Sequence, residues 1–167
     1  MSNSLPQSLV LIGAGKMGGA MLEGWLRIGI DPAHISLIDP TPSDDIVALA
    51  EKTGMWLNPS PADIPAPNVV VLATKPQMLD TAAPAVQAFI HPGTLLISVL
   101  AGKTLDDLAA RLPDAHAIIR TMPNLPAAVQ RGATAAALEV LMADDGMKPL
   151  MRKAVAAAKR RAGELSG

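Results

Sequence analysis

A short aliphatic run followed at once by a glycine-rich turn constrains this chain more than any other feature. Residues 9–12 read Leu-Val-Leu-Ile, a β-favouring run typical of strands that are buried on both faces of a parallel sheet. Gly13, Gly15 and Gly18 follow with the spacing G-x-G-x-x-G, and apolar residues then recur at helical spacing as far as residue 28. The stretch 9–28 therefore predicts a strand, a tight turn and a helix in succession.

Each of the three glycines has its own expected task. Gly13 permits the tight turn, Gly15 lets the backbone approach a pyrophosphate, and Gly18 lets the helix pack closely on the strand. A helix that begins here points its free N–H groups at any anion above the turn. Glycine-rich turns also occur in loops that bind nothing, but a strand before and a helix after favour a dinucleotide site. A Walker-type site is excluded, because Lys16 lies inside the loop and no Gly-Lys-Ser/Thr ends it.

Further apolar runs, separated by helical patterns and short turns, set the fold class. We expect an α/β protein with a Rossmann-like doubly wound, mostly parallel sheet flanked by helices. Ser43 and Thr104 are expected to cap helices, since acidic residues follow each of them in the first turn. Pro84 predicts a lost hydrogen bond, a kink or a boundary within its helix. The further strands are expected at residues 35–38, 55–57, 69–73, 95–99 and 117–120, and the further helices at 43–53, 78–89 and from 104 onward.

The composition limits both the core and the partners. Half of the 167 residues are hydrophobic but only Trp25, Trp56 and Phe89 are aromatic, so the core must be aliphatic and rich in methionine. The net charge of −1 and the few aromatic rings argue against a nucleic-acid or membrane-surface partner. Cysteine is absent and the histidines lack ligand spacing, so no metal site is expected. With no secretory signal or membrane span in view, we expect a cytoplasmic protein.

Asp39 ends the second predicted strand, 21 positions after Gly18. A carboxylate there can accept hydrogen bonds from the ribose hydroxyls of adenosine, or it can merely start the Asp-Pro turn. If it contacts ribose, NAD is favoured, because a 2′-phosphate would meet a like charge and no lysine or arginine lies between residues 40 and 51. Thr41 and Ser43 could still donate hydrogen bonds to such a phosphate.

Other segments lie where doubly wound sheets bind ligands, beyond the carboxyl ends of the strands. Residues 73–77 follow the strand expected beside the first, and Lys75 there can reach a phosphate or hydroxyl or simply remain an exposed lysine. Small residues after the strand at 95–99 leave room for a flat ring. In residues 120–126, two prolines fix the loop and Asn124 can donate and accept hydrogen bonds, although a purely structural loop is the alternative.

Taken together, these motifs resemble pyrroline-5-carboxylate reductase. The matching segments are I-G-A-G-K-M-G at 12–18, A-T-K-P-Q at 73–77, S-V-L-A-G at 98–102 and R-T-M-P-N-L-P at 120–126, of which the last is the most specific. The similarity covers about residues 8–134, which corresponds to the N-terminal cofactor domain of that family. The resemblance implies an enzyme that transfers hydride from NADPH or NADH to the imine of 1-pyrroline-5-carboxylate and so forms proline.

The resemblance also implies a cofactor site. The pyrophosphate would lie over the glycine turn, the adenosine ribose at Asp39 with the segment 73–76 and Ser60 beside it, and the nicotinamide at 99–101 and 122–124. Asp39 departs from members of the family that carry a small polar residue there. No catalytic side chain is assigned, because hydride transfer to a protonated imine needs no general base. The implied cofactor-binding residues are Ile12, Gly13, Ala14, Gly15, Lys16, Met17, Asp39, Ser60, Ala73, Thr74, Lys75, Pro76, Val99, Leu100, Ala101, Met122, Pro123 and Asn124.

The end of the chain departs from the resemblance. Members of the family continue into an all-helical domain that forms the homo-oligomer and binds the substrate, whereas residues 137–167 predict a basic helical tail that does not match. We therefore expect a cofactor domain over residues 1–136, a truncated or altered form of the enzyme, and negligible turnover by this chain alone. Two other hypotheses stay open, namely an NAD(P)-binding module without catalysis and another imine or 3-hydroxyacid-type dehydrogenase.

Overall fold

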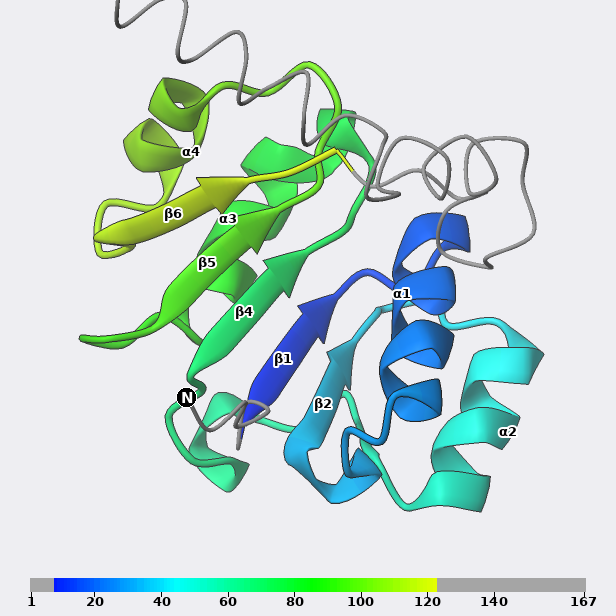
Figure 1. The fold of residues 1–167 in the computed structure, drawn as a ribbon. Helices are drawn as coiled ribbons and strands as arrows, with labels where there is room; N and C mark the ends of the chain where they lie inside the picture. The colour runs from blue at the N-terminus through cyan, green and yellow to red at the C-terminus, as the bar shows by residue number, and fades with distance from the viewer. Residues whose placement is uncertain (1–7, 123–167) are drawn as a thin grey trace, which may run out of the picture. The chain divides into compact units, whose positions relative to one another are not determined.

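A parallel sheet of six strands forms the centre of the computed structural model, which describes residues 8–122. The strands follow the order β3-β2-β1-β4-β5-β6, so the two ends of the sheet are β3 and β6. Figure 1 shows this order from β2 to β6. This order and the helices between the strands confirm the predicted Rossmann-like fold. The strands are β1 (Leu9–Ile12), β2 (Ile35–Ile38), β3 (Trp56–Leu57), β4 (Val69–Leu72), β5 (Leu95–Ser98) and β6 (Ala117–Arg120).

The helices also lie close to their predicted positions, with two corrections. Ser43 does occupy the position before a helix, but its side chain makes no capping hydrogen bond. The helix expected at 78–89 is an α-helix over Leu79–Gln87 that follows a 3₁₀ turn at Pro76–Met78, and Pro84 lies inside that helix without ending it. The α-helices are α1 (Lys16–Arg27), α2 (Asp44–Thr53), α3 (Leu79–Gln87) and α4 (Leu105–Arg111), and the 3₁₀ turns are η1 (Pro32–His34), η2 (Pro61–Asp63) and η3 (Pro76–Met78).

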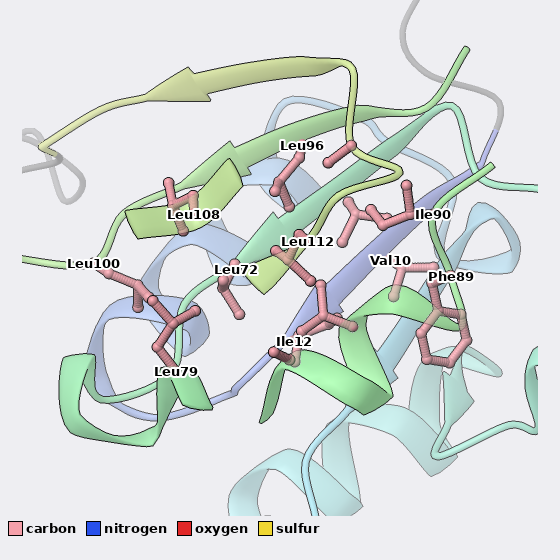
Figure 2. Close-up of a cluster of buried hydrophobic side chains, with 14 residues drawn as sticks. Val10, Ile12, Leu72, Leu79, Phe89, Ile90, Leu96, Leu100, Leu108 and Leu112 are labelled. Atoms are coloured by element: carbon pink, nitrogen blue, oxygen red, sulfur yellow. The ribbon is translucent and has the colours of Figure 1, made fainter. Parts of the chain in front are cut away.

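Alternation along the strands divides the core into two layers. Val10, Val70 and Leu96 face α3 and α4, and Figure 2 shows the cluster that they form with the apolar side chains of those helices. The next residues of the same strands, such as Leu11 and Val71, face α1 and α2 on the other side of the sheet. Both layers consist mainly of aliphatic side chains, as the composition predicts.

The strand order reverses between β1 and β4. Leu9 of β1 pairs with Ile35 of β2 on one side and with Val69 of β4 on the other. The chain leaves β1 into α1 on one face of the sheet and leaves β4 toward α3 on the opposite face (Figure 1). In open α/β sheets, such a reversal opens a crevice beyond the carboxyl ends of the strands, where ligands bind. Within residues 8–122, no helix combines the length and the apolarity that crossing a membrane requires.

Candidate cofactor site

The turn between β1 and α1 is held by contacts that only glycine allows at two positions. Gly13 has a φ of +94°, and a Cβ there would lie 2.9 Å from the backbone of Ala73. A Cβ at Gly18 would lie 2.0 Å from the carbonyl oxygen of Gly13. Gly18 therefore brings the first turn of α1 against the glycine turn itself, which is a closer and more local contact than the helix–strand packing expected from the sequence.

Gly15 differs from both of these glycines because it faces open space. No atom lies within 4 Å of the position that its Cβ would take. Gly15 is also the residue before α1, so that helix begins without a side-chain cap, and its first turn holds no acidic residue. Within residues 8–122, the N–H groups of residues 16–18 meet no acceptor. A helix start with free N–H groups and room above it is suited to a phosphate group.

Asp39 lies directly after β2 and contacts this turn. One carboxylate oxygen, Oδ2, accepts a hydrogen bond of 2.8 Å from the N–H of Ala14, and the other accepts one of 2.9 Å from the N–H of Thr41. The two roles considered for Asp39 are thus compatible, because the carboxylate closes the Asp-Pro turn and still reaches the glycine turn. Each oxygen keeps a lone pair for a ribose hydroxyl. The N–H of Ala14 is bonded to Asp39, so the pyrophosphate would rely on the N–H groups that follow it.

The segment after β4 forms a second wall beside the turn. The N–H of Ala73 donates to the carbonyl oxygen of Ile12 over 2.8 Å, which joins this segment to the end of β1. The hydroxyl oxygen of Thr74 is buried and has no hydrogen-bond partner among the described residues. A buried polar group without a partner is costly, and its position at a strand end suits a site that a ligand completes. Lys75 is exposed, and Pro76 begins the η3 turn.

The ends of β5 and β6 contribute less. Val99 is half-buried and its N–H donates to the carbonyl oxygen of Leu72, while Ala101 is exposed. Leu100 is 1% exposed and belongs to the core beside α3 and α4 (Figure 2). Met122 is exposed. Pro123 and Asn124 lie outside the described residues, as do the predicted domain boundary at 136/137 and the basic tail.

Two residues that follow β3 lie at the same edge of the sheet. Ser60 caps η2 from the position before it, and its hydroxyl accepts a hydrogen bond of 3.4 Å from the N–H of Ala62. Asn58 was not among the residues singled out from the sequence, although its carboxamide exchanges two hydrogen bonds with the backbone of Asp39. The available signal was its place between a strand and a proline, together with the tolerance of asparagine for a positive φ, which here is +51°.

The structure therefore brings four strand ends to one edge of the sheet. The glycine turn, Asp39, the segment 73–76 and the segment 99–101 all follow the carboxyl ends of parallel neighbours. The arrangement offers free N–H groups to an anion and a carboxylate to a pair of hydroxyls. The residues present thus fit an extended ligand that carries a phosphate beside a sugar.

Comparison with known proteins agrees with this geometry. The family model described as NADP oxidoreductase coenzyme F420-dependent matches residues 8–102. A pyrroline-5-carboxylate reductase of Pasteurella multocida is 33% identical over 147 residues, which cover 86% of this chain and 51% of the relative. The chain thus spans about half the length of the curated relatives that it matches.

Solved structures share the fold. A pyrroline-5-carboxylate reductase from Coxiella burnetii matches with a TM-score of 0.64 at 22% identity, covering 95% of this chain and 71% of the other. A pyrroline carboxylate reductase from Plasmodium falciparum, solved with NADP bound, matches with a TM-score of 0.59 at 19% identity and covers 84% of this chain and 54% of the other. At these identities the matches support the fold and not the details of a site.

Proposed function

This chain belongs to the family described as NADP oxidoreductase coenzyme F420-dependent, and on that premise we propose that it binds NAD(P)H at the carboxyl edge of its sheet. One observation carries the proposal, namely the start of α1, which has no cap and faces open space at Gly15. In a Rossmann fold this is the place of the cofactor pyrophosphate. The N–H groups of residues 16–18 would hold it.

The remaining contacts follow from the neighbouring strand ends. The adenosine ribose would lie against Asp39, with Ser60 and residues 73–76 along the adenosine edge. The nicotinamide would lie toward residues 99–101 and 122–124. When bound, the nicotinamide supplies the hydride. The chain's own part is to orient the ring, since direct hydride transfer depends on holding the two reacting atoms near contact distance.

We infer a preference for NADH over NADPH. The carboxylate of Asp39 is fixed beside the glycine turn by its hydrogen bond to the N–H of Ala14. A 2′-phosphate on the adenosine ribose would approach that negative charge, whereas two free ribose hydroxyls can donate to it. The inference differs from the NADP in the family's description and from the NADP bound in the P. falciparum structure, so the two cofactors must be compared directly.

The reaction that we propose is the reduction of 1-pyrroline-5-carboxylate to proline in the cytoplasm, by a homo-oligomer. The support for the reaction comes from curated relatives of that name in Pasteurella multocida and Escherichia coli, each matched over about half of its length. About half of each relative therefore has no counterpart among the matched residues. The site described above accounts for the cofactor half of the reaction only.

Cofactor binding can be tested by fluorescence titration of the chain with NADH and with NADPH. We expect saturable binding that Gly15→Val weakens by about a hundredfold or more, because the side chain fills the space above α1 and removes roughly 3 kcal/mol of interaction. Gly24→Val on the same helix serves as the control, since no atom lies within 4 Å of its Cβ position and it is remote from the turn. Undiminished affinity in Gly15→Val would show that the ligand does not lie over this turn.

The reaction is tested separately by following NAD(P)H oxidation in the presence of 1-pyrroline-5-carboxylate. We expect negligible oxidation by this chain alone, and oxidation that depends on this substrate when a helical domain of the reductase family is supplied in trans. Cofactor binding without any such oxidation, with or without that domain, would reject the reductase and leave a nucleotide-binding module. Equal oxidation of NAD(P)H with an unrelated cyclic imine, or with a 3-oxoacid that is reduced to the 3-hydroxyacid, would point instead to another dehydrogenase.

A further inference from the structure

A series of hydrogen bonds connects the end of the outermost strand, β3, to the glycine turn after β1. It begins at Asn58, directly after β3, and passes through the backbone and then the carboxylate of Asp39 to the N–H of Ala14. Asn58 and Ala14 belong to segments that are far apart in the sequence, and Asp39 is the residue that joins them. The proposed cofactor preference depends on where the carboxylate of Asp39 lies, so whatever fixes this residue also bears on that preference.

Asn58 prolongs the pairing of β2 with β3 beyond the point where their backbones can pair. The last paired residues of the ladder are Leu37 and Leu57, and the N–H of Asn58 then donates to the carbonyl oxygen of Leu37 over 2.7 Å. Pro59, the next residue, has no N–H to donate. The left-handed backbone of Asn58, with φ +51°, is a conformation that asparagine adopts more readily than most side chains.

The carboxamide of Asn58 takes the place of the missing peptide group. Its Oδ1 accepts a hydrogen bond of 2.8 Å from the N–H of Asp39, and its Nδ2 donates one of 2.8 Å to the carbonyl oxygen of Asp39. A primary amide carries the same donor and acceptor as a peptide unit, so this pair imitates one further step of the ladder. Both backbone groups of Asp39 are thereby held from the β3 side.

Asp39 needs this support because it lies outside β2, which ends at Ile38. With its backbone fixed, the carboxylate reaches the N–H of Ala14 at 2.8 Å and the N–H of Thr41 at 2.9 Å. Release of the backbone at Asp39 would let the carboxylate turn toward solvent. The negative charge would then no longer be held beside the place proposed for the adenosine ribose.

We propose that Asn58 is a positioning residue that sets the choice between NADH and NADPH by holding Asp39 against the glycine turn. The proposal rests on the proposed function, since it requires a dinucleotide over that turn. Asn58 acts through Asp39 and needs no contact with the cofactor. The effect follows from electrostatics, because a carboxylate held at one point opposes a 2′-phosphate more than one that can turn away.

The test is a double-mutant cycle on the full chain, read as the ratio of the dissociation constants for NADPH and NADH. Asn58→Gly keeps a residue that accepts a positive φ and removes only the carboxamide. We expect it to shift the ratio toward NADPH by about threefold, a modest change because the carboxylate is partly exposed. In the Asp39→Ser background the same change should leave the ratio where Asp39→Ser alone places it.

Two further variants keep the result interpretable. Asn68→Gly is the matched control, because Asn68 is an exposed asparagine that precedes β4 at the opposite, amino end of the strands, and it should not move the ratio. Asn58→Ser, whose side chain is too short to form both hydrogen bonds, repeats the test if Asn58→Gly does not fold. If the role of Asn58 is merely structural, these substitutions should weaken the binding of NADH and of NADPH alike and leave the ratio of the two dissociation constants unchanged.

The outcomes separate the two proposals. A ratio that stays unchanged in Asn58→Gly and Asn58→Ser, or that shifts equally with and without the Asp39 carboxylate, overturns the positioning role while cofactor binding stands. Failure of the unaltered chain to bind either cofactor overturns the proposed function and this inference with it. A shift that appears only in the presence of Asp39 supports the inference.

Discussion

The starts of α1 and α4 present the same chemical problem and solve it in opposite ways. At α4, the hydroxyl of Thr104 accepts from the N–H of Asp107 over 3.0 Å, and the carboxylate of Asp107 accepts from the N–H of Thr104 over 2.9 Å. At α1 the residue in the same position is Gly15, which has no side chain to offer. The start of α4 is therefore closed by the protein itself, and the start of α1 is left open.

The difference in capping separates a helix start that contributes only stability, at α4, from one that is proposed to bind a phosphate group, at α1. A capping side chain contributes about 1 kcal/mol relative to alanine but only a few tenths of a kcal/mol relative to glycine, so the start at Gly15 gives up stability of that smaller order. The helix that gives it up is the one at the reversal of strand order, where a ligand can supply the missing hydrogen bonds. The same residues that make α1 a weaker helix start thus make it the better anion site.

The largest predicted effect comes from adding a methyl group at the open start. Gly18→Ala would place a Cβ 2.0 Å from the carbonyl oxygen of Gly13, so the turn must move. We expect a loss of about 3 kcal/mol or more in the free energy of unfolding, measured by urea denaturation. Gly24→Ala, in the middle of the same helix with no atom within 4 Å, should instead stabilise the protein by about 0.5–1 kcal/mol. Equal effects at the two positions would contradict the packing described for the turn.

A second prediction converts the open start into a closed one. Gly15→Asp supplies a capping carboxylate at a position with φ −63°, which any residue can adopt. We expect stability to rise by a few tenths of a kcal/mol, since aspartate is only slightly better than glycine as a cap. Binding of NADH should weaken by about a hundredfold, because the carboxylate occupies the N–H groups and repels the pyrophosphate, a loss of roughly 3 kcal/mol. If Gly15→Asp is more stable and still binds NADH with undiminished affinity in a titration, the open start of α1 is not the anion site.

The smallest predicted effect comes from opening the closed start. Thr104→Ala removes the hydroxyl that caps α4, and we expect a loss of about 1 kcal/mol in the free energy of unfolding. NADH affinity should not change, since α4 follows β5 and its first turn is occupied by the protein's own side chains. A change of affinity in this variant would show that the two helix starts are not independent.

The pH dependence of stability supplies the control for this variant. The hydrogen bonds that Asp107 accepts from the backbone and then the side chain of Thr104 lower the pKa of Asp107 below its usual 3.8. A lowered pKa in the folded state means that this stabilisation is present above the ordinary value and is lost as the pH falls through the folded value. Thermal unfolding of Thr104→Ala should therefore depend less on pH in the acid range than that of the unaltered chain.

The sequence predicts the bounds of the strands better than the hydrogen bonds that side chains form between segments. Strands β1, β2 and β6 begin and end at the predicted residues, because an aliphatic run between turn residues leaves little choice of register. The cap at Thr104 follows from residue types at a short spacing, but the same reasoning fails at Ser43, whose hydroxyl makes no such bond. A residue type shows which bond is possible, and the geometry of the particular turn decides whether it forms.

The connection from Asn58 to Asp39 was not predictable in this way. It joins residues that are 19 positions apart, and it exists only because β2 and β3 become neighbours in the folded sheet. The same holds for the hydrogen bond between Asp39 and Ala14, which are 25 positions apart. The carboxylate at the end of β2 could be identified as a candidate from the sequence, whereas the group that orients it could not.

The central pairing of β1 with β4 also has a consequence for how the protein folds. Leu9 pairs with Ile35 in β2 and with Val69 in β4, so the second pairing closes a chain segment more than twice as long as the first. A doubling of loop length adds about 0.6 kcal/mol of closure entropy, and pairings between distant segments slow folding. A nascent chain that has paired only β1 with β2 would already hold the glycine turn and Asp39, but not the wall at Ala73 and Thr74. The wall at Ala73 and Thr74 is thus added to the site only after β4 has been synthesised and the long segment has closed, and residues 99–101 follow with β5.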